Sequence, residues 1–196
     1  MNIVERVTNI LVRPKDEWVA IEKEETSIKE LLVGYLLILA LIPAISNLIA
    51  YWFIGYRVAY VGTVSGGFGY GIRQAILGFV SPVVAAFVAA FIINALAEKF
   101  NSVKDSRRAM QLVVYSYTPG LIAGVFVLIP GLRFVSGLAA LYGLYILYLG
   151  LVPIMKTPAD KVTSYFVVSL IVMVLANLLI GALFAGILVA SPGVYF

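Results

Sequence analysis

The stretch AMQLVVYSYTPGLIAGVFVLIPGLRFVSGLAALYGLYILYLGL, residues 109–151, decides how many times this chain crosses a membrane. As a single helix it would be about 64 Å long, twice the thickness of a bilayer's hydrocarbon core, since each helical residue advances about 1.5 Å. Pro130-Gly131, near its middle, is a turn dipeptide. The stretch therefore predicts two membrane-spanning helices, residues 109–129 and 132–151, joined by a tight turn.

The composition of the whole chain agrees with a membrane protein. Of its 196 residues, 62% are apolar and 12% are charged, and the mean hydropathy is +1.03. Soluble domains average about 45–50% apolar and about 25% charged residues. Cysteine and histidine are both absent, which excludes disulfides, thiol catalysis, thiolate or imidazole metal sites and histidine general bases. We expect no enzyme: no catalytic, cofactor-binding or metal-binding residues, and no cofactor.

Three further apolar stretches, residues 31–54, 75–97 and 164–190, reach the length of about 20 residues that a membrane-spanning helix needs. Ser27 and Glu30 have the spacing of a capping box, which marks a helix start before the first stretch. The predicted fold class is all-α, an integral membrane bundle of five transmembrane helices. We divide the chain into an amphipathic N-terminal segment (1–26), the five-helix domain (27–190) and a short tail (191–196).

The basic residues predict the orientation. With five spans, 11 of the Lys and Arg residues lie on the side of the N-terminus and three, Arg57, Arg73 and Arg133, lie on the other side. Because cytoplasmic loops carry the excess of Lys and Arg, we expect the N-terminus to be cytoplasmic and the C-terminus outside. All ten acidic residues also fall on the proposed inner side, but acids contribute little to orientation.

The N-terminal segment has an amphipathic helical pattern, with apolar residues at positions 3, 7, 10 and 11 and a break at Pro14. Trp18 and Ile21 would share one face of a second short helix. This segment either lies at the membrane surface or packs under the bundle, or it forms a docking face for a soluble partner. With Arg107 and Arg108 of the 98–108 loop, Trp18 and Ile21 form the candidate interfacial or partner face.

The spans carry no ionisable residue at depth, which argues against a proton-coupled transporter or a pump. Asn47 and Asn177 each lie 20 residues after a helix-start signal, so their amides should lie at similar depth. They are candidates for an interhelical hydrogen bond or for a polar permeation site.

Three prolines inside the spans, Pro43, Pro82 and Pro119, are candidate helix kinks. Such kinks occur in ordinary membrane bundles and in the discontinuous helices of transporters. The glycine-rich residues 62–71 are expected to form a flexible loop rather than a phosphate-binding loop, because a nucleotide site needs a preceding core strand.

The chain resembles the Yip family of five-pass membrane proteins, which are named for binding Rab/Ypt GTPases, and above all its prokaryotic branch. The resemblance rests on Glu5-Arg6-Val7 through Leu11 with Pro14 and Trp18, on Arg107-Arg108, on Tyr115-Ser116-Tyr117-Thr118-Pro119, and on a fourth span ending at Gly150. It implies five helices, a cytoplasmic N-terminus in a prokaryotic plasma membrane, a role in membrane organisation or trafficking, and no catalytic residues. The Asp-Leu-Tyr-Gly-Pro motif of eukaryotic members has no match here.

Two functions remain open. The first is a non-enzymatic scaffold or adaptor whose partners are the lipid bilayer and a cytoplasmic protein or anionic lipid. The alternative is a small channel or facilitator for a neutral solute, built as a homo-oligomer because one chain of this size encloses little space. No nucleic-acid partner is expected.

Overall fold

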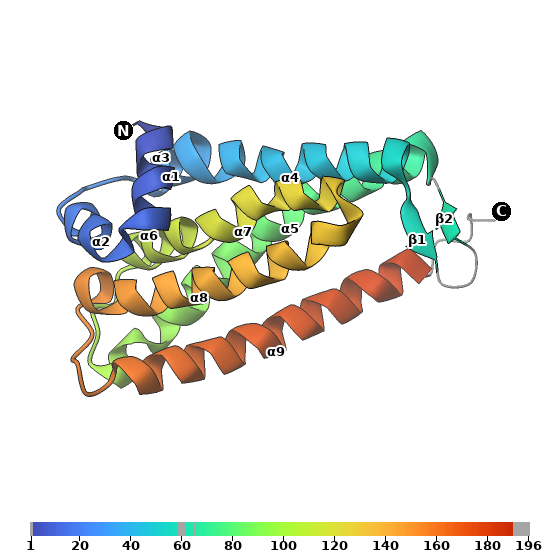
Figure 1. Ribbon diagram of the computed structural model, residues 1–196. Helices are drawn as coiled ribbons and strands as arrows, with labels where there is room; N and C mark the ends of the chain where they lie inside the picture. Colours follow the sequence, from blue (N-terminus) through green and yellow to red (C-terminus); the bar gives the residue numbers. More distant parts are fainter. Residues whose placement is uncertain (1, 59–61, 65, 190–196) are drawn as a thin grey trace.

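The computed structural model describes residues 2–58, 62–64 and 66–189, and within them five helical segments are long and apolar enough to cross a membrane. The segments run side by side, and two short helices pack across one end (Figure 1). The predicted bundle of five transmembrane helices is therefore confirmed. The tail, residues 191–196, lies outside the described residues. The five segments are Ile28–Ile54, Gly67–Phe100, Ser106–Leu128, Pro130–Met155 and Val162–Leu179.

The first segment is built from four helical pieces in succession. Its capping box is confirmed: the Glu30 N–H donates to the Ser27 hydroxyl over 3.2 Å, and the Ser27 N–H donates to the Glu30 carboxylate over 2.8 Å. Two single π-helical turns flank the central α-helix, so the backbone stays hydrogen-bonded to the end of the span. The pieces are α3 (Ile28–Leu31), η1 (Leu32–Leu36), α4 (Leu37–Ile49) and η2 (Ala50–Ile54).

In the second segment the predicted start at residue 75 was wrong, and so was the prediction of a flexible loop over residues 62–71. Helix α5 (Gly67–Leu96) begins before residue 75, and a 3-10 turn, η3 (Ala97–Phe100), ends the segment. Residues 62–71 are therefore not one flexible loop. Strand β1 (Tyr56–Val58) pairs antiparallel with β2 (Gly62–Val64), and Gly67–Gly71 form the first turn of α5. Each glycine costs a helix about 1 kcal/mol relative to alanine, but an unpaired backbone group in lipid costs several.

The third and fourth segments form the predicted hairpin. The third consists of α6 (Ser106–Ser116), α7 (Thr118–Ala123) and the 3-10 helix η4 (Gly124–Leu128); the fourth consists of the 3-10 turn η5 (Pro130–Leu132) and α8 (Arg133–Met155). Between them Ile129 has extended backbone angles, which end the third span one residue before Pro130-Gly131. Two spans, not one long helix, is the correct count for residues 109–151.

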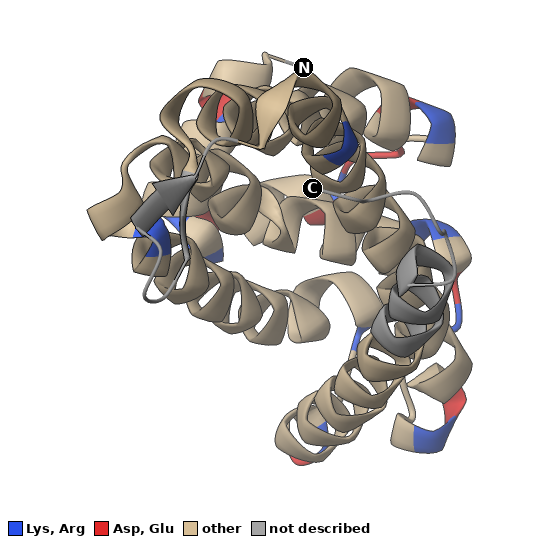
Figure 2. Ribbon diagram, turned by 90° about the vertical axis from the view of Figure 1, so that its right-hand side faces the viewer, with Lys and Arg blue, Asp and Glu red and all other residues tan. Residues whose placement is uncertain are grey.

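The last segment belongs to α9 (Val162–Val189), which lies at the edge of the bundle (Figure 1), where it contacts α5 and α8. The other four segments pack more closely around one apolar core. Its largest fully buried side chains include Tyr35, Tyr115, Leu112, Ile93 and Ile146. The ribbons of the spans are almost entirely uncharged in Figure 2, as a hydrocarbon environment requires.

The three span prolines play two different roles. Pro119 is at the start of α7, after an interruption at Tyr117, where its missing N–H leaves no helical hydrogen bond unmade. Pro43 and Pro82 lie inside α4 and α5, which continue past them, and a kink at either position stays a prediction. Glycines face Pro43: a Cβ on Gly124 would lie 2.7 Å from the Pro43 Cβ, and one on Gly78 would lie 3.1 Å from its carbonyl oxygen.

The N-terminal segment forms two helices, α1 (Ile3–Val12) and α2 (Pro14–Glu22), that pack under the bundle. Helix α2 lies against α8, and α1 contacts α7. The Tyr142 hydroxyl of α8 donates to the Leu11 carbonyl over 2.8 Å. We call α1 and α2 together the N-terminal cap (residues 3–22). Of the alternatives for this segment, packing under the bundle is the one that the structure supports.

Candidate functional site

Two of the four residues predicted for the partner face are in the protein core. Trp18 is 1% exposed and Ile21 is fully buried, so neither is available to a partner or to lipid headgroups, and their assignment to that face was wrong. The Trp18 indole N–H donates to the Ile146 carbonyl of α8 over 3.0 Å. The physical reason is Gly150: because it has no side chain, the Trp18 ring can come within 2.7 Å of the position that a Cβ would occupy. The cap is a structural part of the bundle.

A buried ion-pair cluster fixes the two cap helices to each other. The Arg6 guanidinium of α1 binds the carboxylates of Glu17 in α2 and Glu24 just after it. Side-chain exposure is 6% for Arg6 and 11% for Glu17, but 35% for Glu24. Burial alone would lower the pKa of Arg6, yet the hydrogen bond to Glu24 and the charges around it raise that pKa on balance. Arg6 therefore stays charged at every accessible pH.

The same guanidinium connects the cap to the third span. Its central carbon lies 5.3 Å from the ring centre of Tyr115, a cation–π distance. Tyr115 also makes edge-on contacts with Trp18 and with Tyr35 of the first span, at 6.3 and 4.9 Å between ring centres. The hydroxyls of Tyr35 and Thr118 are 2.8 Å apart and hydrogen-bonded. Residues from the cap, the first span and the third span thus meet in one buried cluster.

Arg107 and Arg108, the other two predicted face residues, are partly exposed and hydrogen-bonded to the backbone. Arg107 donates to the Glu24 carbonyl over 3.3 Å, and Arg108 donates to the Ile154 carbonyl over 3.0 Å. Their side chains remain 32% and 25% exposed. They connect the start of α6 to the residues that follow the cap and to the end of α8.

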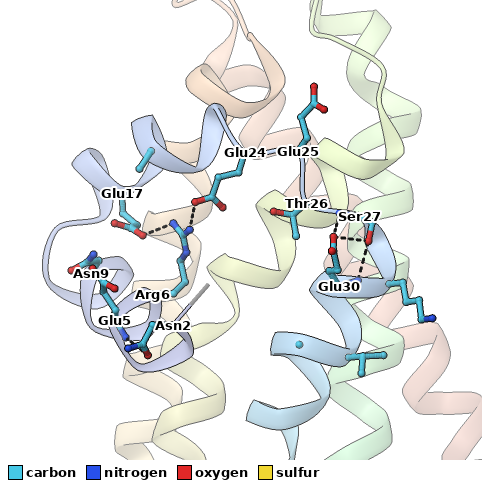
Figure 3. Close-up of a pocket in the computed structure, with 14 residues that line it drawn as sticks. Asn2, Glu5, Arg6, Asn9, Glu17, Glu24, Glu25, Thr26, Ser27 and Glu30 are labelled. Carbon is cyan, nitrogen blue, oxygen red and sulfur yellow. Dashed lines mark hydrogen bonds and ion pairs between the residues drawn. The ribbon is translucent and has the colours of Figure 1, made fainter.

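A polar pocket of about 1150 Å³ opens between the cap and the start of the first span (Figure 3). Its walls come from α1, α2, the connection to α3, and the first turns of the span, where Val33 and Gly34 supply an apolar edge. Sequence reasoning did not identify this pocket, because its walls meet only when the cap folds back. Its charged lining residues are Glu5, Glu17, Glu24, Glu25 and Glu30, with Arg6 and Lys29.

The pocket carries an excess of negative charge. Glu17 and Glu24 share the single positive charge of Arg6, and Glu30 accepts the hydrogen bonds of the capping box. Glu5 and Glu25 are exposed, and within the described residues no Lys or Arg lies within ion-pair distance of either. The pocket therefore presents free carboxylates beside an apolar edge, an arrangement that favours a cationic group attached to an apolar segment.

The two span asparagines do not hydrogen-bond to each other, but Asn47 does form an interhelical hydrogen bond. The Asn47 amide donates to the Gln74 carbonyl of α5 over 3.3 Å. The Asn177 amide donates to the Met173 carbonyl of its own helix over 2.8 Å. Equal depth did not bring them together, because α9 packs on α5 and α8. Nor do the described residues contain a cluster of carboxylates, histidines or cysteines that could hold a metal ion.

These features define a class of protein: a five-pass membrane protein whose N-terminal helices are folded into the bundle and border a polar pocket. The model of the Yip1 domain family matches residues 8–191. The chain belongs to this family, as the resemblance in its sequence predicted. Searches of curated proteins and of solved structures gave no match.

The fold gives a physical explanation for the sequence positions that carry the resemblance to the family. The residues that carried it lie far apart in the sequence, yet Arg6, Trp18, Tyr115 and Gly150 belong to the contacts between the cap and the bundle, and Thr118 joins the third span to the first in the same cluster. These positions are buried. Glu5 and Glu25, by contrast, are exposed and line the pocket.

Proposed function

We propose that this Yip-type membrane protein is a non-enzymatic adaptor that binds the basic segment flanking a transmembrane helix of another membrane protein. The observation that carries the proposal is the pocket beside the cap. It combines exposed carboxylates, Glu5 and Glu25, with an apolar edge at Val33 and Gly34, the first turns of the first span. A ligand that meets both must be cationic on one side and apolar on the other.

The position of the pocket restricts further which kinds of ligand can bind there. Val33 and Gly34 belong to a membrane-spanning segment, whereas α1 and α2 lie beyond its end, so the pocket is at the level of the lipid headgroups. In the proposed orientation, with the N-terminus in the cytoplasm of a prokaryotic cell, it faces the side on which membrane proteins carry their Lys and Arg. A juxtamembrane basic segment has the charge, the depth and the attached apolar helix that the pocket favours.

An anionic lipid headgroup, the other partner considered from the sequence, fits the pocket less well. Five glutamates line it against one arginine and one lysine, and the arginine is already paired with two of the glutamates. A phosphate there would meet like charges, which raise the free energy of binding. The charge therefore favours a protein partner over an anionic lipid.

The channel alternative has less support. It depended on Asn47 and Asn177 as polar groups along a permeation path, but both amides donate to backbone carbonyls. A polar solute crossing the hydrocarbon would need groups free to replace its hydration.

Fluorescence energy transfer in liposomes of phosphatidylcholine tests the adaptor proposal. The probes are two transmembrane peptides with the same polyleucine core, one flanked by lysines and one by serines. We expect transfer to the lysine-flanked peptide alone, weakening as salt concentration rises. The doubly substituted chain Glu5→Lys/Glu25→Lys should lose it.

The control is Asp160→Lys, which changes the charge of another exposed acidic residue on the same side, outside the pocket. This variant should bind the lysine-flanked peptide as the unsubstituted chain does. Equal transfer to both peptides, or equal loss in Asp160→Lys and in the pocket variant, would refute a specific role for the pocket.

A further inference from the structure

A second cavity, of about 690 Å³, lies at mid-span between the helices, and we call it the intramembrane groove. All its lining residues belong to the five membrane-spanning segments. Gly78, Gly120 and Gly143 contribute part of its wall, and Leu144, Leu147 and Leu170 contribute larger side chains. The groove exists because α9 packs on α5 and α8 at the edge of the bundle, leaving space beside α7.

The polar side chains of the groove already have hydrogen-bond partners. The Ser116 hydroxyl donates to the Leu112 carbonyl over 2.7 Å, and the Tyr117 hydroxyl donates to the Ala85 carbonyl over 3.3 Å. The Asn177 amide donates to its own helix. A water molecule is retained in a cavity when it finds two to four polar partners. The groove therefore favours an apolar occupant over water.

The groove is open at its rim to the surroundings of the bundle. Three of its lining residues, Leu141 of α8 and Val174 and Leu178 of α9, are at least half exposed. In a membrane these surroundings are lipid chains. An empty groove would forfeit dispersion contacts along its walls, so the molecules already at the opening would fill it.

The size of the groove distinguishes a lipid chain from a helix. A helix about 10 Å wide crossing about 30 Å of hydrocarbon occupies roughly 2400 Å³, more than three times the volume available. A methylene group is similar in size to a water molecule, with its share of about 30 Å³. The groove thus has room for about 20 such groups, the length of one acyl chain.

We infer that the intramembrane groove binds one acyl chain of a bilayer phospholipid. The chain enters between α8 and α9 and packs along the glycines of α5, α7 and α8. This inference concerns a site within the bilayer and is independent of the pocket at the cap.

Two glycines supply a matched pair of variants. A Cβ added at Gly120 meets no atom within 4 Å, and Gly120 lines the groove, so a larger side chain there takes up space in the groove. Gly137 of α8 has the same open surroundings but lies outside the groove. Gly120→Leu should displace an acyl chain, and Gly137→Leu makes the same chemical change without doing so.

The test is photolabelling in nanodiscs that contain a phospholipid with a diazirine on its acyl chain, followed by mass spectrometric mapping. In the unsubstituted chain we expect adducts at Leu144 and Leu170 in the groove, as well as at Ile171, which is 54% exposed. Gly120→Leu should reduce adducts at the groove positions to the level of fully buried Val113, and leave those at Ile171 unchanged. Gly137→Leu should change neither.

Two results would overturn the inference. One is labelling of Leu144 and Leu170 that never exceeds that of Val113, and the other is groove labelling that survives Gly120→Leu. A second copy of the chain is a competing occupant. Because the chain has no cysteine, Gly120→Cys carries a unique thiol; disulfide-linked dimers together with unlabelled groove positions would assign the groove to that second copy.

Discussion

The Arg6 cluster allows a prediction whose magnitude follows from burial. Replacing Arg6 with methionine keeps most of the apolar volume and removes the charge that faces Glu17 and Glu24. Glu17, at 11% side-chain exposure, is then left as an isolated carboxylate in a nearly dry site. Glu24 is 35% exposed, and water can replace much of its lost partner.

Removing one partner of a buried ion pair costs about 3–5 kcal/mol, and an exposed pair contributes about 0–1 kcal/mol. Because Glu17 is nearly but not fully buried, we expect Arg6→Met to lower the free energy of unfolding by about 3 kcal/mol. Adding Glu17→Gln removes the uncompensated charge. The double variant should therefore recover about half of the loss, which gives a coupling of at least about 1.5 kcal/mol between the two positions, because the cost of Glu17→Gln alone adds to it.

The assay is unfolding in mixed micelles by increasing proportions of a denaturing detergent, followed through the fluorescence of Trp18, which contacts the cluster. Glu25→Gln is the control, because Glu25 is exposed and lies in the pocket without an ion pair to a described residue. Free-energy losses that simply add, or a loss below about 1 kcal/mol in Arg6→Met, would show that the ion pairs do not hold the cap.

Three other variants probe how the cap is attached. Gly150→Ala should lower the free energy of unfolding by about 1–3 kcal/mol, because its Cβ would lie 2.7 Å from the Trp18 ring, whereas Gly137→Ala, in open space, should not. Trp18→Phe should cost a similar amount, since it removes a buried hydrogen bond and ring volume from the core; its unfolding is followed by helical circular dichroism, because the variant lacks the Trp18 fluorophore. Lys156 holds the pKa of Glu22 below its usual 4.5 through their hydrogen bond, so the pair's contribution, about 0–1 kcal/mol, is present above that value and lost as the pH falls through the lowered pKa. Unfolding measured between about pH 6 and 3 should show this loss, and Glu22→Gln should remove it.

The number of spans could be predicted because it depends on local composition. A bilayer requires long apolar helices, and the sequence contains five stretches of that length. The boundaries at Ser27 and Pro130 also followed from local rules of capping and turns. The boundary at Gly67 was missed, because helix propensity argued against glycine there while the demand for backbone hydrogen bonds decided the outcome.

The position of the cap could not be predicted, because it depends on contacts between distant residues. The Trp18 indole binds a carbonyl 128 residues away, and no periodicity in residues 3–22 distinguishes a helix that packs on protein from one that packs on lipid. The suggested pairing of Asn47 with Asn177 failed for a similar reason, although Asn47 does make an interhelical contact, with the Gln74 carbonyl of α5. Depth follows from counting residues, but the lateral arrangement of helices does not.

One signal in the sequence did point to the pocket, although its meaning required the structure. All ten acidic residues fall at the same end of the spans as 11 of the bases, where they leave that side almost neutral. Membrane insertion responds to Lys and Arg and gives acids little weight. Acids can therefore accumulate there without reversing the topology. In the folded chain, Glu17 and Glu24 pair with Arg6, Glu22 pairs with Lys156, and Asp105 caps α6.

These pairs account for acids that hold the structure together, and they leave Glu5 and Glu25 exposed in the pocket. Deleting residues 1–26 would remove both at once, but it would also remove Trp18 and Ile21 from the core. Loss of partner binding in that deletion would thus not separate recruitment from folding. Charge reversal at Glu5 and Glu25 leaves every described contact of the cap's core intact, so loss of binding there is the result that implicates the pocket.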